Sequence, residues 1–245
     1  MSTADKLTAI AENIPKVYES GKQAEYDRFW DAVQNYGNRT NYNRGFCGMT
    51  WTDDNFKPKY DIRPNGQNSA YSLFGFAAIT DLVELLEKQG IVLDTSKASG
   101  LFGEMFANSS VTRIPTLDLT NANISNGTTN MFANCNRLKT IDKIIMSENT
   151  ITYSMFNGVT ALENVIFEGV IGYTIDFKSV PLSKDSIISI VNALSATKTG
   201  QTLTLKKSAV NNAFSINVDD ETTYPVGSEY HTLRHSKDNW TFSYI

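Results

Sequence analysis

The chain has 245 residues, a net charge of −4 at pH 7 and 41% hydrophobic residues. This is enough apolar material for one large domain, or for a domain with an appendage. No basic cluster exceeds Lys206-Lys207 and no apolar run approaches the roughly 20 residues of a membrane span, so we expect neither a nucleic-acid partner nor membrane insertion.

Residues 1–36 are predicted to be a helical segment for docking or oligomerisation. They begin without the basic and apolar regions of a signal peptide. Apolar residues recur at intervals of three and four, as in a coiled-coil seam, at Leu7, Ile10, Ile14 and Val17. Two alternatives remain open: the segment packs on its own domain, or it joins copies of the chain into a homo-oligomer, for which we favour a trimer.

Residues 37–70 are predicted to form an irregular N-terminal cap, rich in Asn, Gly and Tyr. Trp51 and Phe56 are expected to cover the first end of the core that follows. The two cysteines, Cys47 and Cys135, are too few and too far apart in the sequence to indicate a disulfide framework. We expect Cys135 to be a small buried residue.

A helix with recognisable ends is predicted over residues 80–90. Thr80 is the expected N-cap, Asp81 falls in the first turn, and Gly90 follows the last turn. A strand is expected directly afterwards, at 91–93.

Residues 71–182 contain a repeated phrase. Met105-Phe106-Ala107-Asn108 returns 26 residues later as Met131-Phe132-Ala133-Asn134, and 24 residues after that as Met155-Phe156-Asn157-Gly158. A degenerate copy precedes them at Leu73-Phe74. A period in the twenties is typical of a solenoid, whose copies must stack to bury their apolar residues. Phe132 and Phe156 are therefore predicted to be buried and stacked on their neighbours.

Each copy leads into a predicted strand, at 116–119, 141–146 and 164–170, and these strands should lie parallel and side by side. Alternate residues would then face outward in a row: Thr116, Asp118, Asp142, Lys143, Ile166 and Glu168. Repeat proteins often bind partners through such a row. A plain solvated sheet is the alternative.

Residues 183–245 are predicted to be the final coil and C-terminal cap. Ser183 is a plausible N-cap, and Leu182 can pack on Ile187 across the helix start. Alternating residues at 202–205 and 240–244 indicate strands.

No group of residues indicates catalysis, a cofactor or a metal site. His231 and His235 would share one face of a helix, but no third ligand is indicated. Nucleophile, base and orienting group are not arranged together anywhere in the sequence. We therefore expect a protein that is not an enzyme and carries no cofactor.

The pattern Met-Phe-x5-Leu-x-x-Ile, with Asn134-Cys135 in one copy and Leu117-Asp118-Leu119 after another, resembles the BspA-like bacterial leucine-rich repeats over residues 71–182. The resemblance implies an α+β fold, namely a short leucine-rich-repeat solenoid with a parallel β-sheet, N-terminal helices and a C-terminal cap.

The opening of the chain, with residues 7–30 followed by 51–58, looks like repeat proteins encoded in phage tail modules and prophages of Firmicutes. That resemblance implies a non-enzymatic tail-tip or tail-fibre protein, made in the host cytoplasm and located in the virion tail. Its partners would be other tail proteins and a bacterial surface glycan or protein receptor. The alternative is a bacterial leucine-rich-repeat module for protein–protein interaction or adhesion without a phage role.

Overall fold

The computed structural model describes residues 45–48, 50–54, 56, 61–64, 70–99, 102–122 and 127–245. The predicted helical segment 1–36, with its seam of Leu7, Ile10, Ile14 and Val17, lies outside these residues. None of the helices in the described part of the chain has the length and apolar composition needed to cross a lipid bilayer.

The described chain is mixed α/β, with parallel sheets. Its elements in order are α2 (Leu82–Gln89), β1 (Arg113–Ile114), β2 (Leu117–Asp118), β3 (Thr140–Met146), β4 (Asn164–Gly169), β5 (Ile175–Phe177), α3 (Lys184–Ala193), β6 (Gln201–Leu205), α4 (Lys207–Phe214), the 3₁₀ turn η1 (Glu221–Thr223), α5 (Glu229–His235) and β7 (Trp240–Tyr244).

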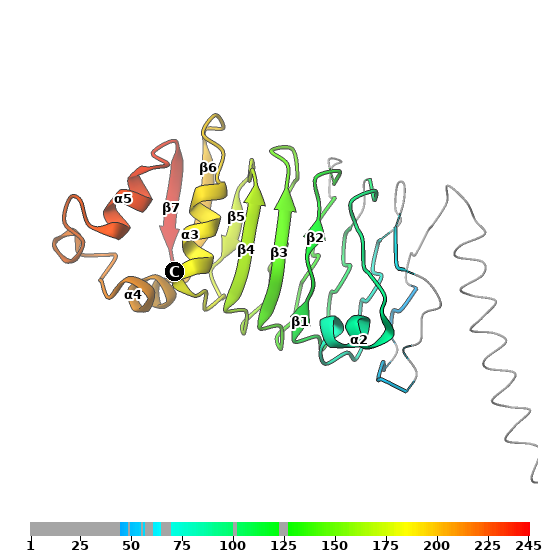
Figure 1. Ribbon diagram of the computed structural model, residues 1–245. Helices are drawn as coiled ribbons and strands as arrows, with labels where there is room; N and C mark the ends of the chain where they lie inside the picture. Colours follow the sequence, from blue (N-terminus) through cyan, green and yellow to red (C-terminus); the bar gives the residue numbers. More distant parts are fainter. Residues whose placement is uncertain are drawn as a thin grey trace, which may run out of the picture.

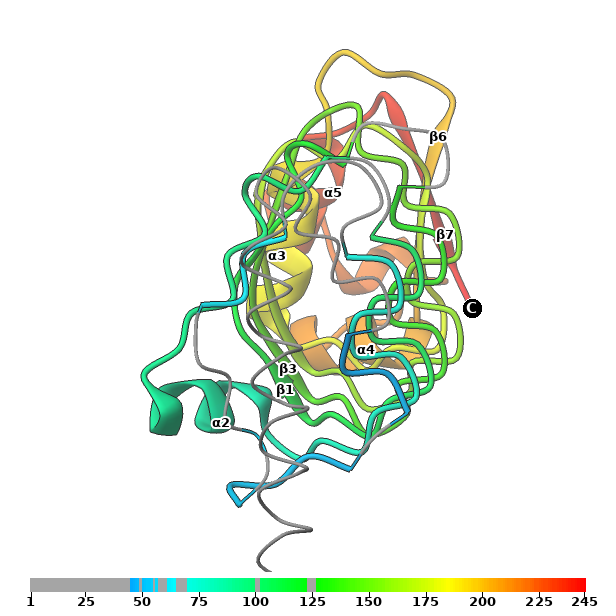
Figure 2. The ribbon, with the colours of Figure 1, turned by 90° about the vertical axis from the view of Figure 1, so that its right-hand side faces the viewer.

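The chain winds in successive turns that stack along one axis (Figure 1). One face carries a parallel sheet in which β1 and β2 both pair with β3, and β3 pairs with β4. The opposite face carries tight turns and then a second parallel sheet, ordered β5-β6-β7. Viewed along the stack, β1, β3 and α3 lie on one side, and β6 and β7 lie on the other (Figure 2).

A column of stacked phenylalanines runs through the core between the two faces. Phe106 and Phe132 have ring centroids 5.7 Å apart, and Phe132 and Phe156 are 5.2 Å apart. Phe132 is 0% and Phe156 3% exposed, so the predicted burial and stacking are confirmed. The column includes Phe74 of the degenerate copy and extends beyond the repeats to Phe46 at one end and Phe177 at the other.

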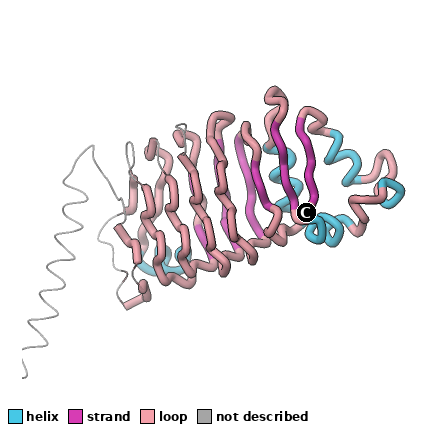
Figure 3. Tube along the Cα trace, turned by 180° about the vertical axis from the view of Figure 1, so that it is seen from behind, coloured by secondary structure: helices cyan, strands magenta, loops and turns pink. Residues whose placement is uncertain are grey.

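Segments 72–77, 102–109, 128–135 and 152–159 form what we call the turn ladder (Figure 3). Within a segment, backbone N–H groups donate to the carbonyl three residues earlier. Alternate N–H groups donate instead to the next segment, as from Phe106 to the Met131 oxygen at 2.9 Å and from Phe132 to the Met155 oxygen at 3.0 Å. Each segment carries positive φ angles four residues apart, for example +55° at Asn130 and +59° at Asn134. Asn is among the side chains that tolerate this conformation best.

Three local predictions are wrong. The N-cap of α2 is Asp81, not Thr80, because the Asp81 carboxylate accepts the Glu84 N–H at 3.0 Å. Residues 91–93 form no strand, since only Leu93 pairs, in a single bridge with Ile62. The predicted strand 116–119 is two short strands that begin at 113. Pro115 separates them because it has no N–H to donate to the sheet.

The C-terminal predictions agree with the structure. Ser183 caps α3, with its hydroxyl accepting the Ser186 N–H, and both Leu182 and Ile187 are buried. β6 and β7 lie where the alternating patterns indicated.

The predicted end of the first helix is also confirmed, because Gly90 ends α2 with φ +63°.

Candidate binding face

The outward-facing side chains of β1–β4 form the surface that the sequence nominated for binding, and we call it the strand face. Its inward partners, Ile114, Leu117 and Leu119, are all 0% exposed. Thr116, Ile166 and Glu168 are exposed, and Asp118, Asp142 and Lys143 are half-buried. The parallel ladder of backbone hydrogen bonds therefore holds the predicted row on one surface.

A bulge explains why two consecutive residues of β3 both lie on this surface. Ile141 pairs with Val165 and Ile144 pairs with Phe167, so three steps along β3 match two steps along β4. The extra residue places Asp142 and Lys143 together between buried neighbours, opposite the single outward residue Ile166.

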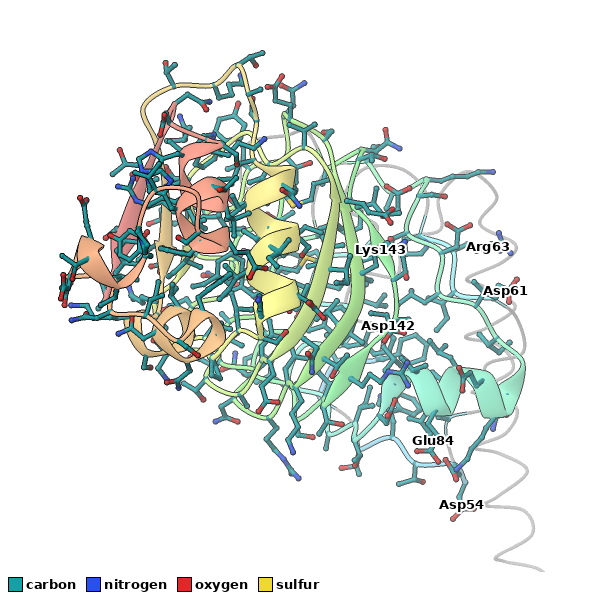
Figure 4. All side chains as sticks on the ribbon, turned by 60° about the vertical axis from the view of Figure 1, so that its left-hand side comes forward. Asp54, Asp61, Arg63, Glu84, Asp142 and Lys143 are labelled. Atoms are coloured by element: carbon teal, nitrogen blue, oxygen red, sulfur yellow. The ribbon has the colours of Figure 1, made fainter. Side chains whose placement is uncertain are left out.

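The charged side chains of the strand face pair across the strands. Arg113 Nε donates to Asp142 Oδ1 at 2.9 Å and its Nη2 donates to Asp142 Oδ2 at 3.2 Å, a two-pronged pair between β1 and β3. Lys143 Nζ lies 2.6 Å from Glu168 Oε1 on β4. Asp142 and Lys143 project side by side from the sheet (Figure 4). These pairs fix the positions of the charges and leave the local surface close to neutral.

Arg113 is the member of this surface that sequence reasoning missed. It lies on the first short strand, three residues before the predicted strand 116–119. Its hydrogen bond to Asp142 raises the Arg113 pKa above the ordinary value. Only the strand register, in which Arg113 lies opposite Thr140, brings it within reach of Asp142.

The two N-terminal members of the predicted row differ from the rest. The Asp118 carboxylate accepts the backbone N–H of Thr120 at 2.9 Å and its hydroxyl at 2.6 Å. It therefore closes a local turn and is less available to a partner. Thr116 is exposed beside the break between β1 and β2.

Outside the strand face, the two histidines and two cysteines are the remaining candidates for metal binding or nucleophilic catalysis. His231 and His235 lie on α5 with ring centroids 4.3 Å apart. Among the described residues, no group of three or more His, Cys, Asp or Glu side chains is placed to hold a metal ion. Cys47 and Cys135 are free, and burial raises the pKa of the Cys135 thiol to about 11. A nucleophilic cysteine needs the opposite shift.

Comparison of the chain with protein-family models, with curated proteins and with solved structures gives no match.

Proposed function

We propose that the chain is a non-enzymatic leucine-rich-repeat protein of a phage or prophage tail, and that its strand face binds the bacterial cell surface. The stacked turns would be a BspA-like solenoid closed by a C-terminal cap. The tail assignment rests on the resemblance of the sequence, and the choice of surface rests on geometry.

The observation that carries the choice of surface is the charge-paired row on a rigid sheet. Arg113, Asp142, Lys143 and Glu168 come from three successive turns and are held in place by ion pairs and backbone ladders. A partner that meets such a surface finds donors and acceptors already in position, which lowers the entropic cost of binding.

The test is binding of the labelled full chain to a panel of intact Firmicutes cells. We expect an Asp142→Ala, Lys143→Ala double variant to lose binding. The variant should remain folded, because exposed ion pairs contribute little to stability. The matched control is Lys184→Ala, Glu229→Ala, which removes a 2.6 Å ion pair between α3 and α5.

If the two double variants bind the cells equally well, the strand face is not the binding surface. Antibody detection of the chain in purified tail particles supports the tail assignment. Binding to cells without any chain in such particles favours the adhesion module. The homo-oligomer expected through residues 1–36 and the absence of enzymatic activity remain predictions.

A further inference from the structure

A cleft of about 420 Å³ opens on the face opposite the strand face, where the turn ladder meets β5. We call it the junction cleft. Its walls come from the last ladder segment, from residues 173–179 and from Gln201 at the start of β6. Volumes of a few hundred Å³ are typical of small-molecule sites.

The cleft exists because the backbone changes conformation at this level of the stack. Earlier ladder segments donate alternate N–H groups to the next turn, as Asn134 does to the Asn157 oxygen at 2.8 Å. The turn after residues 152–159 is an extended strand, β5, which pairs on its other edge with β6. In the core the stack continues unbroken, with the Phe156 and Phe177 rings 4.7 Å apart.

Because β5 is extended and does not continue the ladder, N–H groups of the last ladder segment remain unpaired at the cleft. In the described part of the chain, the N–H groups of Ser154, Phe156 and Gly158 have no acceptor. Ser154 has φ +52° and Gly158 has φ +73°, which repeats the pattern that directs N–H groups toward the next turn in earlier segments. A row of unpaired N–H groups along one edge favours a ligand that supplies acceptor atoms.

The side chains around these N–H groups include aromatic rings, hydrogen-bond donors and hydrogen-bond acceptors. Tyr153 is 67% exposed and Tyr173 is half-buried. Lys178 Nζ lies 3.1 Å from Asp176 Oδ2, so the two charged side chains that line the cleft balance each other. The Gln201 amide oxygen is occupied by the Thr174 N–H at 2.8 Å, while its NH₂ group makes only a 3.5 Å contact with the Thr199 oxygen.

This combination discriminates between ligand classes. A free anion would be attracted by Lys178 but repelled by the neighbouring Asp176 carboxylate. A saccharide has hydroxyl groups that both donate and accept, and a face of C–H groups that packs on an aromatic ring. It can use the backbone donors, the carboxylate and the exposed tyrosine at once.

We propose that the junction cleft binds a neutral saccharide, with its ring against Tyr153 and its hydroxyls on the Ser154, Phe156 and Gly158 N–H groups. Neither the turn ladder nor β5 alone could form this site. The proposal does not depend on the strand face binding anything.

The test is titration of the ¹⁵N-labelled full chain with methyl glycosides of glucose, galactose, mannose and N-acetylglucosamine, up to concentrations on the order of 10 mM. We expect at least one of them to shift the amide signals of Ser154, Phe156 and Gly158. Tyr153→Ala should weaken that binding roughly tenfold. Because this side chain is mostly exposed, the variant should keep the wild-type spectrum elsewhere.

The matched control is Phe76→Ala, which removes another exposed aromatic from the turn ladder, 60% accessible and away from the cleft. It should leave the affinity unchanged. Absence of any shift at the three amides with all four glycosides would overturn the proposal. So would shifts produced by inorganic phosphate alone, which would identify an anion site. Loss of cell binding in the strand-face variants would not alter these titrations.

Discussion

The strand face and the turn face both end where a different kind of element follows, but only the strand face has its terminal N–H groups paired. On the strand face, the sheet ends against α3, and the hydroxyls of Ser186 and Ser189 accept the N–H groups of Val165 and Phe167 at 2.9 and 3.3 Å. On the turn face, the ladder ends against β5, and among the described residues no comparable side chain accepts the N–H groups of Ser154, Phe156 and Gly158.

The difference shows which level of structure holds the stack together. Phe156 lies in the core at the level where both faces change, and it packs against Phe132 and Phe177. The core is therefore continuous through this level. The backbone pattern can therefore change on either face without interrupting the core. On the strand face, α3 supplies acceptors for the last N–H groups of the sheet. On the turn face, β5 supplies none, so the N–H groups of the ladder remain available to a ligand.

The largest effect is expected from removing the shared core. Phe156→Ala, like Phe132→Ala, should lower the free energy of unfolding by roughly 3–5 kcal/mol, because it deletes a buried ring and leaves a cavity. Urea denaturation measures the change. The exposed Phe76 is the control, and Phe76→Ala should change stability by no more than about 0.5 kcal/mol. A loss below about 1 kcal/mol for Phe156→Ala would show that the column does not support the stack.

The sealed edge should be the next most sensitive feature. Ser186 is 1% exposed, and its hydroxyl accepts the Val165 N–H and donates to the Glu163 oxygen at 3.0 Å. Ser186→Ala leaves the Val165 N–H unpaired, whereas the Glu163 oxygen keeps the Ser183 N–H at 2.8 Å. The loss should cost roughly 1–3 kcal/mol in the free energy of unfolding. Ser208→Ala, at an exposed serine on α4, is the control for the substitution itself. Equal stability of the two variants would mean that α3 does not seal the sheet through this serine.

The sequence predicted the core well because a buried ring at each turn leaves a periodic signal. Phe46 and Phe177 were missed because they lack the Met-Phe phrase, although they extend the same column. The strand face was predicted from alternation, but its partner Arg113 depends on register. The junction cleft left no sequence signal, because its donors are backbone N–H groups whose pairing depends on the next turn.

A smaller effect is expected within the ladder itself. Asn134 has φ +59°, and its side-chain amide donates to the Asn108 amide oxygen at 3.0 Å. Asn134→Ala should cost about 1 kcal/mol in the free energy of unfolding, mainly because alanine resists this conformation. Asn134→Gly keeps the conformation and loses the amide, so it should cost less than about 0.5 kcal/mol. Equal losses in the two variants would assign the effect to the amide instead.

The smallest effect is expected from the hydrogen bonds that join Glu148, after β3, to Ser195 and Thr197, after α3. Glu148 Oε1 accepts hydrogen bonds from the Ser195 hydroxyl and from Thr197 Oγ1, the latter at 2.7 Å. These bonds, Ser195 first, hold the pKa of Glu148 below its ordinary value. A carboxylate whose pKa is lowered by folding stabilises the protein above the unfolded pKa, and that stabilisation is lost as pH falls through the folded pKa.

We therefore expect wild-type stability to fall more steeply than that of Glu148→Gln as the pH drops below the ordinary glutamate pKa of 4.5. Urea midpoints measured across that range provide the comparison. Ser195→Ala should reduce the same slope, and adding it to Glu148→Gln should change the slope little further, because both substitutions remove one interaction. Identical slopes in wild type and Glu148→Gln would show that Glu148 does not tie residues 195–197 to the end of β3. The junction would then be held by the phenylalanine column and the serine-sealed edge.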